Sequence, residues 1–149
     1  SNDIIAYLDI DYVFKNSNLG KKIIFNLNEQ NKKNLLDLKK KEDKLIKIEK
    51  DLIEKKKILS KVEFDNKLAD LKSNIKLFRS EKDELVKSFE RKKNDEIKIF
   101  FKKVNPILEK FMTDNSIKII IDKKNVLIAK ETLDVTMDIN TLINQELDK

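Results

Sequence analysis

The sequence predicts an α+β protein in which a long antiparallel helical hairpin, a coiled-coil arm, joins a small β-rich base. Two observations lead to this fold class. The run from Leu19 to about Phe111 is dense in Lys, Glu and Asp, holds one Gly and one Pro, and carries Leu, Ile and Phe at helical spacing. The segments on either side of this run are short and rich in β-branched residues. The expected order is therefore strand, helix, helix, strand, strand, helix.

The composition favours long helices over disorder. Charged residues make up 40% of the 149 residues, whereas ordinary globular domains are about a quarter charged. Disordered chains are also rich in charge, but Ile, Leu and Phe are too frequent here for that class. We expect one domain over residues 1–149, with a base formed by 1–18 and 105–149 and an arm formed by 19–104.

The residue types that most enzyme and metal sites use are missing from the chain. It has no Cys and no His, which removes thiol chemistry, the commonest general base and the commonest metal ligand. No Gly-rich phosphate loop is present, and no run reaches the roughly 18 apolar residues of a membrane span. We therefore expect a protein that is not an enzyme and takes no cofactor, metal ion or small-molecule substrate.

The chain begins with a short apolar strand. Residues 4–10 are rich in Ile and aromatic side chains, which is typical of a buried strand. Asp9 or Asp11 is expected to cap a short helical turn over residues 12–14, and Ser17 is a good N-cap for the helix that follows.

The first long helix is expected over residues 18–57. Its leucines recur every seven residues, at Leu38, Leu45, Leu52 and Leu59. The partner positions between them are charged, at Glu42, Glu49 and Lys56. The apolar seam is therefore narrow, and it suits a slender two-helix arm better than a wide core.

The turn of the hairpin is expected at Ser60, because Ser60 and Glu63 form a capping box. Leu59 and Phe64 on either side have the spacing of a hydrophobic staple. The alternative is one uninterrupted helix, since no Gly or Pro marks the turn.

The second long helix is expected over residues 61–112. Its first half has apolar residues alternating by four and three, at Phe64, Leu68, Leu71, Ile75 and Phe78. The denser apolar cluster at residues 97–104 predicts burial on several sides at this end of the helix. Residues 117–122 and 126–130 then read as a hairpin of two strands, and a last helix is expected from Asp138 to Leu147.

The expected strands leave open sheet edges, and the arm has a thin seam, so we predict a homo-oligomer that pairs its bases. The net charge is +6, and residues 32–61 contain twelve Lys against six Asp and Glu. This excess favours an acidic partner, which could be nucleic acid, anionic lipid or acidic protein. The alternative is a Lys-rich surface that only keeps the chain soluble.

Several stretches resemble the Skp or OmpH-like family of periplasmic chaperones. They are Ile5-Ala6-Tyr7-Leu8-Asp9, then Val13, Ser17 and Gly20-Lys21-Lys22 with the family's spacing, Leu59-Ser60, Ile117 to Asp122, Val126 to Ala129, and Asp138-Ile139-Asn140. The resemblance implies a homotrimer whose arms enclose a cavity and hold unfolded outer-membrane proteins without ATP. It also implies a periplasmic location, with a signal peptide removed upstream of Asp3. Ser1-Asn2 are either native residues or an added remnant.

The resemblance also suggests site residues. The expected client contacts are Leu59, Val62, Phe64 and Leu68, with Phe64 preferred over the seam residues Phe78 and Phe89. The expected contacts with lipopolysaccharide or acidic clients are Lys82, Arg91 and Lys92, for which a solvated basic turn is the alternative. The expected trimerisation body comprises Ile5, Tyr7, Leu8, Ile119, Ile121, Val126 and Ile128.

Two rival functions remain at this point. A prefoldin-like holdase would place its strands between the two long helices, whereas here they lie outside both. A basic hairpin that binds nucleic acid, or serves as a structural interaction module, would need stacking aromatics beside the lysines, and these are scarce.

Overall fold

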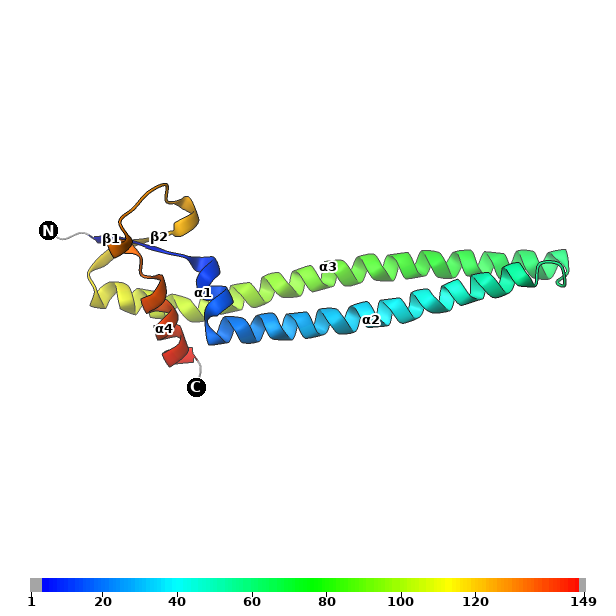
Figure 1. Cartoon of the computed structure of the whole chain (residues 1–149), viewed down its shortest axis with the longest axis horizontal. Helices are drawn as coiled ribbons and strands as arrows, with labels where there is room; N and C mark the ends of the chain where they lie inside the picture. Colours follow the sequence, from blue (N-terminus) through cyan, green and yellow to red (C-terminus); the bar gives the residue numbers. More distant parts are fainter. Residues whose placement is uncertain (1–3, 148–149) are drawn as a thin grey trace. The chain divides into compact units, whose positions relative to one another are not determined.

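The computed structural model describes residues 4–147, so the ends of the expected base, including Ser1-Asn2, lie outside the described residues. Its elements follow in the order β1, α1, α2, α3, β2 and α4 (Figure 1). Their bounds are Ile4–Leu8, Ile10–Asn16, Asn18–Glu54, Lys61–Asp114, Ile117–Asp122 and Thr136–Leu147. The predicted fold class, long helices with a small strand-containing part, is confirmed.

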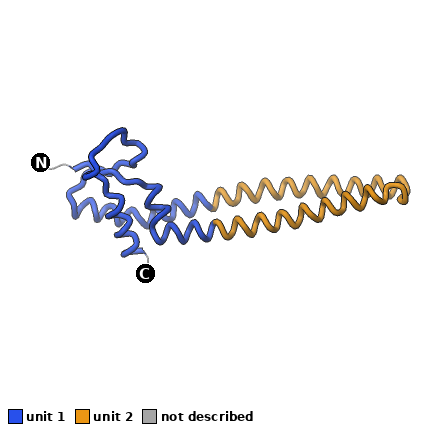
Figure 2. Tube along the Cα trace, in the orientation of Figure 1, with its two compact units in different colours: residues 1–27, 93–149 blue, residues 28–92 orange. Residues whose placement is uncertain are grey.

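The chain divides into two compact units, which Figure 2 shows in different colours. One unit comprises residues 28–92 and contains parts of α2 and α3. The other comprises residues 1–27 and 93–149 and contains the strands, α1, α4 and the remaining parts of the two long helices. The base predicted from the sequence falls inside this strand-containing unit, which is blue in Figure 2.

Strands β1 and β2 pair in parallel, with Ile5 opposite Ile119 and Tyr7 opposite Ile121. A parallel pair needs a long connection between its strands, and here α1, α2 and α3 together form it. The N-terminal strand therefore pairs with residues 117–122, the first strand of the predicted hairpin. The segment that precedes α4 lies along the other edge of β1, where the Val135 N–H donates to the Tyr7 carbonyl at 3.0 Å.

The predicted third strand over residues 126–130 is wrong. The structure has 3-10 turns at Lys123–Asn125 and Glu131–Leu133, and the residues between them pair with no strand of the described chain. Leu127 and Ile128 are almost fully exposed. Residues 126–130 have the composition of a strand. A strand also needs a neighbouring backbone with which to form hydrogen bonds, and no strand within residues 4–147 pairs with this segment.

The core of the strand-containing unit is centred on Phe100, which is fully buried. Its ring meets the rings of Phe14 and Phe101 edge to face, with centroids 5.1 and 5.2 Å apart. Ile139 and Ile143 of α4 are also fully buried in this cluster. The burial predicted for the dense apolar end of the second long helix is thus found at Phe100 and, nearby, at Val104.

Two side-chain caps set the start of the helices as predicted. The Tyr12 N–H donates to Asp9 Oδ1 at 3.0 Å, so Asp9 and not Asp11 begins α1. Ser17 ends α1, and its buried Oγ accepts from the Gly20 N–H at 3.1 Å in the first turn of α2. The side chain of one serine therefore joins two helices.

The hairpin turn also lies where the sequence predicts it, and the uninterrupted helix is excluded. Helix α2 ends at Glu54, about one turn earlier than expected, and α3 begins at Lys61. The Glu63 N–H donates to Ser60 Oγ at 3.2 Å, which is the first half of the predicted capping box.

Candidate functional site

No candidate metal site is present in the described part of the chain. Over residues 4–147 no group of three or more His, Cys, Asp or Glu side chains is placed to hold a metal ion. Within the same residues, no helix combines the length and the apolar content that crossing a membrane requires.

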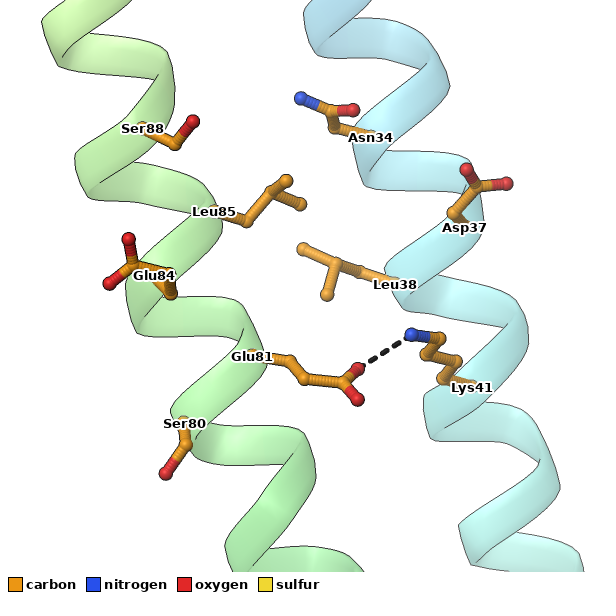
Figure 3. Close-up of a pocket in the computed structure, with 9 residues that line it drawn as sticks. All are labelled: Asn34, Asp37, Leu38, Lys41, Ser80, Glu81, Glu84, Leu85 and Ser88. Atoms are coloured by element: carbon orange, nitrogen blue, oxygen red, sulfur yellow. Dashed lines mark hydrogen bonds and ion pairs between the residues drawn. The ribbon is translucent and has the colours of Figure 1, made fainter.

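The seam between α2 and α3 is thin in the middle of residues 28–92. Leu38 and Leu85 point toward each other across it, and Lys41 Nζ meets Glu81 Oε2 at 2.6 Å (Figure 3). Polar residues such as Asn34 line the rest of a hollow of about 580 Å³. One leucine pair and one ion pair at this level leave the two helices loosely packed, as the charged heptad positions predict.

Of the predicted client contacts at the turn, three of four are engaged within the hairpin. Leu59, Phe64 and Leu68 are half-buried, whereas Val62 is 70% exposed. Lys56 Nζ also lies 5.6 Å from the centroid of the Phe64 ring, in cation–π geometry. Only Val62 of this set presents most of its side chain to a ligand.

The turn exposes a residue that the sequence reasoning did not single out. Ile58 is 82% exposed, and it stands in a run of lysines, with Lys55 to Lys57 before it and Lys61 after it. The sequence contains a signal for this exposure, because Ile58 lies outside the heptad positions that form the seam. The half-buried Leu59 beside it lines a groove of about 310 Å³ with Leu52 and Leu71.

The three predicted basic contacts do not converge on one patch. Arg91 Nη2 pairs with Glu84 Oε1 at 2.9 Å, and Lys92 Nζ donates to Gln30 Oε1 across the helical pair. Lys82 precedes Arg91 by nine residues on the continuous helix α3. Nine residues make about two and a half turns, so Lys82 and Arg91 project from opposite sides of α3.

The predicted trimerisation residues divide into two groups. Tyr7 and Leu8 are buried in the chain's own core, and Ile121 and Val126 are half-buried. Three are exposed, and these are Ile5, Ile119 and Ile128. Leu127, next to Ile128, is exposed as well. Along β1 the exposed residues Ile4 and Ile5 precede the buried residues Ala6 to Leu8, so the division follows position along the strand.

The helical pair carries many more exposed aliphatic side chains than the sequence reasoning identified. Within residues 28–92, all of which the structure describes, nine large hydrophobic residues are exposed. They are Leu35, Leu36, Ile46, Ile48, Ile53, Ile58, Val62, Leu77 and Val86. A search for heptads selects the seam and passes over these residues.

Comparison with known proteins gives a consistent family and fold. A model of the family described as outer membrane protein (OmpH-like) matches residues 4–143. A crystal structure from Caulobacter crescentus, described as an OmpH-like outer membrane chaperone, superimposes with a TM-score of 0.89 at 14% identity, covering 97% of this chain and 86% of that chain. At this identity the superposition shows a shared fold. A sequence comparison with curated proteins found no match.

Proposed function

The chain belongs to the OmpH-like outer membrane protein family, and from this premise we propose that it is a chaperone of the holdase type. It binds unfolded outer-membrane proteins without ATP and prevents their aggregation in the periplasm. The likeness to a solved structure described as an outer membrane chaperone supports the first part of this proposal.

The observation that carries the proposal is the set of exposed aliphatic side chains on a highly charged helical pair. Nine such side chains over residues 28–92 offer many small contacts. Each contact contributes little, but several engaged together by one flexible chain give tight and reversible binding. The excess of Lys over residues 32–61 attracts acidic clients in addition.

We further propose that the chain works as a homotrimer whose helical arms enclose the client. Ile5 and Ile119, which lie opposite one another in the sheet, are exposed, and Leu127 and Ile128 are exposed as well. These apolar side chains and the open edge of β2 are features that a second copy can cover. Residues 126–130 have the composition of a strand and lack a partner strand within the described chain, which is the condition for pairing between copies.

A light-scattering assay tests the holdase function. A urea-unfolded β-barrel outer-membrane protein is diluted into buffer with and without the purified chain, and no nucleotide is added. We expect turbidity to be suppressed at near-equimolar trimer. Aggregation that proceeds at the same rate with and without the chain would refute the proposal.

The mass of the particle in solution tests the assembly. Multi-angle light scattering is expected to give about three times the chain mass of 17.6 kDa. Replacing Leu127 and Ile128 together by Asp is expected to lower this mass, because two charges would enter the apolar surface. The matched control replaces the equally aliphatic Leu36 and Leu77 of the helical pair and should leave the mass unchanged. A monomer at micromolar concentration would exclude the trimer.

Anionic lipid or lipopolysaccharide remains a candidate partner through Lys82, Arg91 and Lys92. Lys82 projects away from Arg91 on α3, so the three residues do not form one patch, and we test Arg91 and Lys92, which are adjacent in sequence, as the contact pair. Replacing both by Gln and measuring retention on lipopolysaccharide-coated beads distinguishes a site from a solvated turn.

A further inference from the structure

Three of the exposed aliphatic residues form a line along α2, which we name the lateral stripe: Leu35, Ile46 and Ile53. They are 57%, 44% and 63% exposed. Their spacings are eleven and seven residues, and at about 100° per residue the three side chains lie within about 20° of one another around the helix. The seam residues Leu45 and Leu52 point roughly a quarter turn away.

Lysines accompany the lateral stripe on one side. Lys39 follows Leu35 by four residues, and Lys50 follows Ile46 by four and precedes Ile53 by three. Side chains at these spacings are neighbours on a helix surface. Lys39 Nζ has a partner in Asp43 Oδ1 at 3.7 Å, but both side chains are largely exposed, and such surface pairs are weak enough for a ligand carboxylate to compete.

We propose that the lateral stripe is the principal client-binding surface of the helical pair. It takes an extended polypeptide that carries both aliphatic side chains and carboxylates. This inference rests on the proposed holdase function. It assigns the client contact to α2 instead of the predicted residues Leu59, Phe64 and Leu68, which are half-buried within the hairpin.

The spacing of the lateral stripe suits an extended chain better than a helix. Its aliphatic residues are about 16 and 10 Å apart along α2, which an extended polypeptide spans in about five and three residues. A partner helix needs apolar contacts about every 3.5 residues for a coiled-coil seam. Three aliphatic residues over a stretch of nineteen are too few for that.

The charges around the lateral stripe favour a polypeptide over a membrane surface. Glu42 and Glu49 lie between the stripe and the seam, opposite Lys39 and Lys50. A helix that lies on an anionic membrane has a wide apolar face bordered by cations on both sides. Here the stripe is one residue wide and has carboxylates on one side, so a chain with local acidic groups is the better match.

The test compares two triple variants of the full-length chain. The first replaces the lateral stripe, Leu35, Ile46 and Ile53, by Ser. The control replaces Leu36, Ile48 and Leu77 by Ser; these residues are 60%, 46% and 59% exposed and lie on other faces. Both variants lose similar exposed aliphatic area, and circular dichroism confirms that both remain helical. The readout is the Kd for a fluorescent, urea-unfolded β-barrel outer-membrane protein, measured by anisotropy.

We expect the stripe variant to bind at least tenfold more weakly, because three side chains that leave water on client binding are lost. Leu36, Ile48 and Leu77 belong to the same set of exposed residues but make only minor client contacts in this proposal, so the control should lose no more than about threefold in affinity. Replacing Lys39 and Lys50 by Gln should weaken binding and flatten its salt dependence.

Three outcomes would overturn the inference. Equal weakening in both triple variants would mean that contacts are spread over all faces. A stripe variant that binds client normally but no longer binds phosphatidylglycerol vesicles would mean that the lateral stripe binds lipid. A parent chain that binds no unfolded client would remove the holdase function, and the client surface with it.

Discussion

Replacing Gly20, the chain's one glycine, by Ala tests how closely the first two helices are joined. Gly20 lies in the first turn of α2, and α1 ends just before it. A Cβ added at Gly20 would lie 1.7 Å from the carbonyl oxygen of Phe14 and 2.6 Å from its carbonyl carbon. Both are backbone atoms, so no change of side-chain rotamer removes the clash.

Gly20→Ala is expected to lower the free energy of unfolding by about 3 kcal/mol. In an ordinary helix interior Gly→Ala stabilises by about 1 kcal/mol. Here α1 and α2 must separate by well over 1 Å to reach normal contact, and overpacking of this kind costs about 1–3 kcal/mol or more. The separation also stretches the bond from the Gly20 N–H to Ser17 Oγ and pulls Phe14 from the ring of Phe100, adding about 1–2 kcal/mol.

Urea unfolding followed by circular dichroism measures this change, at fixed protein concentration because assembly would add to stability. We expect a lower midpoint at an unchanged m-value. Ser17→Ala provides the comparison, since it removes the cap without adding an atom and should cost about 1 kcal/mol. A Gly20→Ala chain as stable as the parent chain, or more stable, would refute the close approach of Phe14 to α2.

Three further predictions concern stability. Phe100→Ala should cost about 3–5 kcal/mol, because a fully buried ring and two aromatic contacts are lost; a loss below 1 kcal/mol in urea unfolding would contradict the described core. Ser116→Gly should stabilise by about 1 kcal/mol, since Ser116 has a φ of 55° that glycine adopts without strain; an unchanged melting temperature would argue against that backbone conformation. A double-mutant cycle of Lys41→Ala and Glu81→Ala should give a coupling below about 1 kcal/mol, because both side chains are more than half exposed; a coupling above 2 kcal/mol would mean that this pair holds the seam together.

The thin seam and the exposed stripe are consistent with one another. A narrow contact between two helices leaves most of each helix surface free, and a highly charged sequence keeps that surface soluble even with aliphatic residues on it. Nine exposed aliphatic side chains over residues 28–92 would be a liability on a surface without charge. Here Lys and Glu separate the aliphatic side chains, so the surface offers several weak contacts without a large continuous apolar patch.

The sequence by itself determined the features that depend on neighbouring residues. Asp9, Ser17 and Ser60 cap helices at the predicted places, because capping needs only a side chain and the amides up to three residues ahead. The seven-residue spacing of Leu38, Leu45 and Leu52 likewise indicated which face of the helix meets its partner.

The tertiary structure decided what depends on distant parts of the chain. Residues 126–130 have strand composition but form no strand, because no backbone within the described residues lies beside them. The direction of β1 against β2 follows from the long helical connection, which composition does not encode. Leu59 and Phe64, which the sequence predicts as client contacts, are half-buried in the structure. The lateral stripe on α2 became visible only once the seam was located, since exposure is a property of the packed pair and not of its sequence.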